Sequence, residues 1–220
     1  MIDVKGIRGS GNVTTETRDI AEPFTGIDAS SGMEVALSQG PQMVKVEADD
    51  NVQPHILTKV ENGVLKISSD YNSFIDVKSR KVIVSIPDIR MLESSSGVEM
   101  WSTGTLRGQR IRTKAGSGSE MKLDLEYDEI DSESSSGSSV ELKGKALKLS
   151  TSSSSGSSLD ASGLMANDVT ARSASGSTTT VHPLVTLDAE ASSGSSVNYT
   201  HQPKKKIRSD ASSGGSISKI

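Results

Sequence analysis

Apolar and polar residues alternate one by one over much of the second half of the chain. The segments 140–142 and 145–151 are examples: Val140 and Leu142 are two positions apart, as are Leu147 and Leu149, and a charged residue lies between the members of each pair. This period of two is typical of β-strands with one buried face, since successive side chains of a strand point to opposite sides. The pattern therefore predicts short strands.

A repeat of about 20 residues organises these strands. The glycines that lie inside serine-rich clusters are separated by 21, 19, 19, 20, 18 and 20 residues. Alignment on them gives one apolar column three residues after the glycine, with a single threonine, and a second seven residues before it. The glycines are Gly97, Gly118, Gly137, Gly156, Gly176, Gly194 and Gly214; the first column is Met100, Met121, Val140, Leu159, Thr179, Val197 and Ile217; the second is Ile111, Ile130, Leu149, Val169, Leu187 and Ile207.

The two columns predict a parallel β-helix. Each repeat offers two short strands joined by a Ser-Gly corner, and stacking repeats at about 4.8 Å would align each column into an apolar ladder. Small serine side chains suit a tight corner, and glycine supplies backbone angles that other residues avoid. A flexible Ser/Gly linker is the competing interpretation, but linkers carry no phased apolar columns.

The first third of the chain is less regular. Gly11 and Gly32 fit the spacing, but the next phased glycine, Gly97, comes 65 residues later. The segments 43–47, 64–67 and 82–86 look like strands, and Glu61, Asn62 and Gly63 indicate a hairpin turn. We expect one domain over 1–220, in which residues from about 38 to 92 cover the N-terminal end and residues 93–220 form regular rungs.

Composition and charge exclude several classes of function. The net charge of −4 gives no basic surface for nucleic acid. The absence of cysteine excludes disulfides and thiolate chemistry. Residues 1–6 lack the pattern of a signal peptide, and no apolar run is long enough to span a membrane.

Several segments together resemble a known bacterial family. They are Gly9-Ser10-Gly11-Asn12-Val13, the stretch 46–51, the Ser-Ser-Gly-Ser-Ser clusters at 135–139, 154–158 and 192–196, and the final segment 212–217. The chain resembles the putative autotransporter adhesin, head GIN domain family from about residue 10 to 220. This resemblance implies a right-handed parallel β-helix in an exported protein of the Gram-negative periplasm or cell surface. It brings no catalytic motif and no ligand residues.

A candidate ligand site lies near the start of the regular rungs. Glu99 and Glu120 occupy equivalent positions in adjacent repeats, as does Glu34 in an earlier one, and Trp101 follows on the same side. Adjacent carboxylates could bind Ca²⁺ or perform acid/base chemistry, and an exposed Trp could stack on a sugar ring. The interpretations without a ligand are a solvated acidic face and a Trp covered by the N-terminal cap.

Other polar residues form weaker candidates. His182 and His201 are 19 residues apart and could stack on neighbouring rungs, whereas His55 stands alone. The lysines at 204–206 are most simply a solvated turn, and the glycine-rich segment 6–11 lacks the strand-loop-helix context of a phosphate loop. We expect no cofactor and no metal.

The sequence favours a non-catalytic binding or adhesion module of the cell envelope. Its partners would be a glycan, a host or surface protein, or a second copy of the chain, bound along a long face. A carbohydrate-active β-helix enzyme is the first alternative, and it would need convergent carboxylates and a basic residue in a groove. A structural envelope protein that self-associates is the second.

Overall fold

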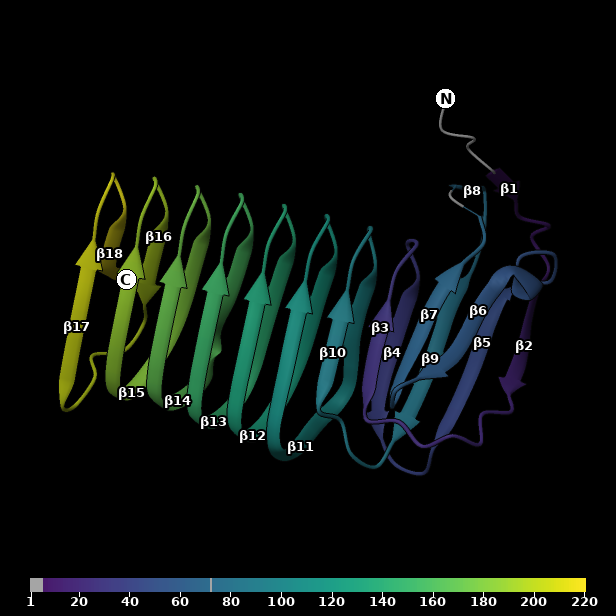
Figure 1. The fold of residues 1–220 in the computed structure, drawn as a ribbon, viewed down its shortest axis with the longest axis horizontal. Coiled ribbons are helices and arrows are strands. Elements are labelled where there is room, and N and C mark those ends of the chain that lie inside the picture. Colours follow the sequence, from purple (N-terminus) through teal and green to yellow (C-terminus); the bar gives the residue numbers. More distant parts are fainter. Residues whose placement is uncertain (1–5, 72) are drawn as a thin grey trace.

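The protein is an all-β solenoid of about six turns with about 20 residues in each rung, as the computed structural model shows (Figure 1). The structure describes residues 6–71 and 73–220, so most of the N-terminal run in which no signal peptide was predicted lies outside the described residues. The predicted fold class is confirmed. In Figure 1 the chain runs up the nearer side of each rung, down the farther side and onward to the left, which makes the coil right-handed.

The interior rungs are single long strands that bend once, where two short strands were expected. The hydrogen-bonded ladder continues around the lower bend with local register shifts, so only the Ser-Gly turn interrupts the strand in each rung. These strands are β11 (Glu99–Ala115), β12 (Glu120–Ser134), β13 (Ser139–Ser153), β14 (Ser158–Ser173) and β15 (Thr178–Ala191). The last rung is shorter, with β16 (Ser196–Tyr199), β17 (Lys206–Ala211) and β18 (Ser216–Lys219).

We call the half of each strand that leads into the Ser-Gly turn the front arm, and the half that follows the turn the rear arm. Front arms stack into one sheet and rear arms into another, and both predicted apolar columns lie between the two sheets. Val140 and Leu149 of β13 are each 1% exposed. The columns therefore form the core of the rod, as predicted, except at the final rung.

The turns have a conformation that costs their serines backbone energy. Ser136 and Gly137 both have positive φ, at 52° and 70°, and the same pair recurs in every regular turn. Two successive positive φ angles define the type I′ turn, which joins strands tightly. The Gly137 amide donates to the carbonyl of Ser155 in the next turn at 3.1 Å, so the turns form a ladder of their own.

Serine after the turn glycine is buried and bonds across rungs. The Ser138 hydroxyl donates to the carbonyl of Ala115 in the preceding rung at 2.9 Å and accepts the N–H of Ser135 at 3.0 Å. Ser157, Ser177 and Ser195 repeat both contacts. Each hydroxyl thus satisfies polar backbone groups inside the corner, which explains why a polar residue recurs in the core.

The N-terminal cap includes the 65-residue gap in the repeat. Its elements are β1 (Gly6–Arg8), β2 (Val13–Arg18), β3 (Gly26–Ala29), β4 (Glu34–Gln39), β5 (Met43–Asp49), η1 (Gln53–His55), β6 (Ile56–Glu61), β7 (Val64–Ser69), β8 (Ser73–Ile75), β9 (Arg80–Ile86) and β10 (Met91–Ser94). The rung of β3 and β4 stacks directly beneath β10 and β11, and its Gly32 N–H donates to Ser96 O at 2.9 Å. Mixed strands then cover the end, with β5 antiparallel to β9 and β2, and β6 antiparallel to β7 through the predicted hairpin.

A buried aspartate ties the cap together. Asp49 is 0% exposed, and its carboxylate accepts N–H groups from Gly11 at 2.8 Å, Lys78 at 2.9 Å and Ser79 at 3.1 Å. Burial alone would raise the pKa of Asp49, but these three N–H donors lower it below its usual value. The two N-terminal segments that carry the family resemblance, 9–13 and 46–51, therefore contact each other.

None of the helices among the described residues is long and apolar enough to cross a membrane.

Candidate binding surface

The predicted carboxylates do come together on the rear sheet. Glu99 lies in register with Glu34 on one side and with Glu120 on the other, so three carboxylates follow one another along the rod. Glu120 is engaged by Lys122 at 2.6 Å, and this hydrogen bond raises the pKa of the lysine. In the part of the chain that the structure describes, no group of three or more His, Asp or Glu side chains could hold a metal.

Trp101 is half-buried rather than fully exposed. Its neighbours in register are Ala36 in the preceding rung and Lys122 in the following one, and the strand register shifts just beyond it. The face that it shares with Glu99 and Glu120 remains a predicted ligand site, now with a lysine beside it.

His182 and His201 stack on neighbouring rungs, as predicted. Their rings are 5.3 Å apart between centroids and nearly parallel, and His182 Nδ1 lies 3.0 Å from the hydroxyl of Thr200. The third histidine, His55, lies in the cap with its ring edge-on to Tyr71 and its Nδ1 3.0 Å from Asp70. The pair and the single histidine are therefore at opposite ends of the rod.

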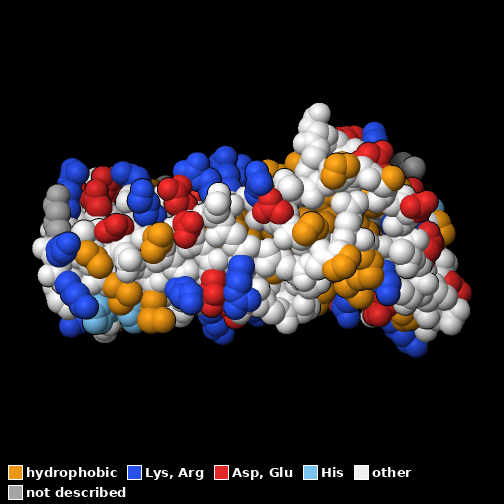
Figure 2. Space-filling view, turned by 90° about the horizontal axis from the view of Figure 1, so that it is seen from below, with side chains coloured by type: hydrophobic (Ala, Val, Ile, Leu, Met, Phe, Trp, Pro, Cys, Tyr) orange, Lys and Arg blue, Asp and Glu red, His pale blue; other side chains and the backbone are white. Residues whose placement is uncertain are grey.

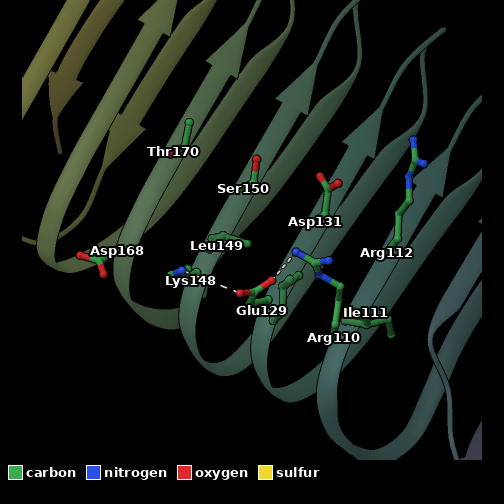
Figure 3. Close-up of a pocket in the computed structure, with 11 residues that line it drawn as sticks. Arg110, Ile111, Arg112, Glu129, Asp131, Lys148, Leu149, Ser150, Asp168 and Thr170 are labelled. Carbon is green, nitrogen blue, oxygen red and sulfur yellow. Dashed lines mark ion pairs between the residues drawn. The ribbon is translucent and has the colours of Figure 1, made fainter.

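A hollow that the sequence did not indicate lies on the outer face of the front sheet. It has a volume of about 530 Å³ and extends over four rungs, from Arg110 on β11 to Thr170 on β14 (Figure 3). A second hollow of about 480 Å³ continues it past Arg110 toward Asp88 and Arg90. We call the two together the front groove.

Charge alternates from rung to rung along this groove. Arg110, Glu129, Lys148 and Asp168 follow one another in register, so each charge lies beside an opposite one, and the two inner residues have an opposite charge on both sides. Glu129 binds Arg110 at 2.5 Å through one oxygen and approaches Lys148 at 3.8 Å through the other, as Figure 3 shows. The parallel stacking therefore builds an ion-pair ladder from residues about 19 positions apart.

The neighbouring column supplies hydroxyls and further charges. Arg112, Asp131, Ser150 and Thr170 stand in register two residues further along the same strands. The guanidinium of Arg112 donates to Glu133 at 2.7 Å, a hydrogen bond that raises the pKa of this arginine. Donors and acceptors thus repeat at the rung spacing of about 4.8 Å along the groove.

The signal that could have revealed the groove lies in the flanks of the second apolar column. Residues six and eight positions before each turn glycine point outward, and they form the two columns just described. Within a single repeat, these outward residues cannot be distinguished from those of an ordinary solvated strand. Only alignment of four repeats shows that their charges alternate.

A different hollow, more apolar, lies at the bend edge opposite the turns. It holds about 430 Å³ and is lined by Tyr127, Leu147, Met165 and Leu184 among others. Leu147 is 54% exposed and Met165 48% exposed, and hydrophobic side chains are visible along this edge in Figure 2. Tyr127 donates its hydroxyl to Ile89 O at 2.8 Å, and burial raises its pKa to about 12. We call this feature the bend hollow.

Comparison with solved structures shows the same fold in several bacterial proteins. A putative adhesin from Bacteroides fragilis has a TM-score of 0.90 at 21% identity, with 98% of this chain and 100% of that chain covered. A putative adhesin from Parabacteroides merdae has a TM-score of 0.76 at 14% identity, with 98% and 99% covered. A protein from Parabacteroides distasonis described as a putative lipid binding protein has a TM-score of 0.77 at 18% identity, with 98% and 100% covered.

The family comparison agrees with these structures. A search of curated proteins finds no match. A family model described as putative auto-transporter adhesin, head GIN domain, matches residues 23–203, which include most of the cap, every interior rung and the front groove. The chain therefore belongs to the family of putative auto-transporter adhesins with a head GIN domain.

Proposed function

We propose that this protein is a non-catalytic adhesion module, exported to the periplasm or cell surface of a Gram-negative bacterium, that binds a polar ligand along its front groove. The family description and the relatives from Bacteroides and Parabacteroides support the adhesin role and the location. The ligand is a glycan or a protein surface that carries both charges and hydroxyls. No cofactor takes part.

The observation that carries this proposal is the repetition of the groove. Four successive rungs present donors and acceptors at one spacing, so an extended ligand meets a polar contact at every rung. Individual contacts at an exposed surface are weak, but several on one ligand combine into useful affinity. A long regular face suits an elongated chain better than a compact small molecule.

The contacts of Glu129 favour binding over catalysis in this groove. Both of its oxygens face cations, Arg110 on one side and Lys148 on the other. A catalytic carboxylate needs an oxygen that is free to contact the substrate, whereas both oxygens of Glu129 are directed at side chains of the protein itself. The carbohydrate-active enzyme remains the alternative for the rear face, where Glu99, Trp101 and Glu120 lie.

The test is a glycan and host-matrix array screen of the purified chain, with and without Ca²⁺, followed by product analysis of every hit. We expect retention without turnover, and Lys148→Ala should reduce it by about tenfold because a groove contact is lost. Lys143→Ala is the matched control, because Lys143 lies on the rear arm of the same strand, is 66% exposed against 67% for Lys148, and also faces a glutamate.

The same screen separates the faces and the reactions. Cleavage of a retained glycan would replace the adhesin proposal by the enzyme. Binding that Lys148→Ala leaves intact but Trp101→Ala removes would move the site to the rear face. If nothing on the array is retained, the structural envelope role is favoured.

The bend hollow supports a second candidate, binding of an apolar chain. Leu147 and Met165 are the two most exposed large hydrophobic side chains of the interior rungs, and both line it. The relative from Parabacteroides distasonis is described as a putative lipid binding protein. Titration with a fluorescent fatty acid should then show saturable binding that Met165→Asp abolishes, and an absence of binding would exclude this candidate.

A further inference from the structure

The C-terminal end of the rod differs from every interior rung. Interior strands are paired along both edges, whereas β17 pairs only with β15 and β18 only with β16. Within residues 6–71 and 73–220 no strand lies beyond this last rung, which is at the left of Figure 1. A row of unpaired backbone N–H and C=O groups is a ready template for another strand.

The apolar column is open at the same end. Ile207 is 37% exposed, although Leu187, its counterpart one rung earlier, is 1% exposed. Ala211 is exposed where its counterpart Ala191 is 1% exposed. The opposite end of the apolar column is covered by the mixed strands of the cap, so among the described residues the column is uncovered at the C-terminal end.

The direction of the backbone groups determines how a strand can add here. Ser212 donates its N–H inward to Ala191 O at 3.0 Å. Because successive residues of a strand direct their backbone groups to opposite edges, Arg208 and Asp210 also point toward β15. The backbone groups of Ile207, Ser209 and Ala211 therefore point to the open edge.

We propose that a second copy of this chain pairs with the open rung across a twofold axis, with the two β17 strands antiparallel and centred on Ser209. In this register Ile207 lies opposite Ala211 of the second copy, and all three outward-pointing residues pair their backbone groups. Arg208 lies opposite Asp210 of the second copy, twice by symmetry. One register thus satisfies backbone pairing, apolar contact and charge together.

The lysines that precede β17 are compatible with the same dimer. Lys204 and Lys205 lie at the start of the front arm, and antiparallel pairing places them beside the Ser-Gly turn of the second copy rather than beside each other. Arg208 is 3.8 Å from Asp188 of its own chain and is 62% exposed, so it remains open to a second carboxylate. The dimer would present two front grooves on one rod, and it does not depend on what those grooves bind.

Charge reversal tests this dimer by analytical ultracentrifugation at micromolar concentrations. The native chain should sediment as a dimer. In Asp210→Arg the new arginine faces Arg208 of the second copy, twice by symmetry, and this repulsion should weaken association by about tenfold or more. The double variant Arg208→Asp with Asp210→Arg exchanges the two charges and should restore association. Asp128→Arg, an equal charge change at the exposed bend edge of β12, should leave the dimer intact.

A cysteine provides an independent readout, since the chain has none. Ser209→Cys lies on the proposed axis, where facing Cα atoms of a hydrogen-bonded pair are about 5.5 Å apart, within the range that a disulfide spans. Oxidation should yield a covalent dimer, whereas Ser158→Cys on an interior rung should not. A monomeric native chain, or a dimer unaffected by Asp210→Arg and not cross-linked through Ser209→Cys, would overturn the proposal.

Discussion

The interior rungs and the N-terminal cap are held together in different ways. In the rungs the main contacts are repeated: the apolar columns and the turn ladder recur from β11 to β15, and the buried serine after the turn glycine recurs from Ser119 to Ser195. In the cap the contacts are made once, and three N–H groups from two distant segments meet on the single carboxylate of Asp49.

This difference shows where each region is vulnerable. A repeated structure distributes its stability over many equivalent neighbours, approximately as a sum of rung and interface terms. The cap instead depends on a few specific polar contacts, because its mixed strands do not share one register. Substitutions should therefore act through burial in the rungs and through hydrogen bonding in the cap.

The largest effect should come from a charge placed in a rung column. Leu149→Asp buries an unpaired carboxylate and should cost about 4 kcal/mol or more of unfolding free energy. Leu147→Asp is the matched control, because it makes the same change two residues away at a side chain that is 54% exposed, and it should cost less than about 0.5 kcal/mol. Urea denaturation of the two variants measures the difference, and equal midpoints would contradict the column assignment.

In the cap, a single carboxylate should have the next largest effect. Asp49→Ala leaves three N–H groups without their charged acceptor and should cost about 3 kcal/mol. Hydrogen exchange should show the loss of protection in 6–19 and 43–86, with the interior rungs retained. Asp50→Ala, at the exposed neighbour, should cost clearly less, and global unfolding by Asp49→Ala would contradict the independence of the two regions.

The pH dependence of stability should separate the same regions. The pKa of Asp49 is lowered in the folded state, so its contribution is present above the unfolded value of about 3.9 and is lost as the pH falls through the folded value. Cap protection, followed by hydrogen exchange between pH 2 and 6, should therefore fall at the acidic end. Asp49→Asn should flatten this dependence, and an unchanged slope would assign the acid sensitivity to other groups.

The smallest effect concerns the turns of the rungs. Ser136 has φ of 52°, which costs a residue with a side chain more than it costs glycine, so Ser136→Gly should stabilise by about 0.5 kcal/mol. Ser152→Gly, at an exposed strand position of the adjoining rung, should instead destabilise by about 0.5 to 1 kcal/mol. Thermal unfolding of both variants gives the sign, and a loss at Ser136 would show that its hydroxyl matters more than its backbone angle.

Much of the fold could be predicted because it depends on residue types that recur at a fixed spacing. The columns through Val140 and Leu149 recur at the glycine spacing, and the hairpin at Asn62 and Gly63 has local turn chemistry. The adjacency of Glu99 and Glu120 and the stacking of His182 on His201 follow from the same spacing. The continuous bend of each strand was missed, because nothing in one repeat distinguishes a bent strand from two strands.

The sequence by itself determined the period, the buried columns and the turns, because each depends on residue type at short, fixed separations. Only the tertiary structure decided which polar neighbours bind one another: Glu129 pairs with Arg110 and approaches Lys148, and the buried Asp49 accepts N–H groups from Gly11 and Lys78. The physical reason is that stacking brings residues about 19 or more positions apart to within hydrogen-bonding distance. The front groove forms only because stacking places the charges and hydroxyls of successive rungs side by side, and the open last rung is the end of the same stack.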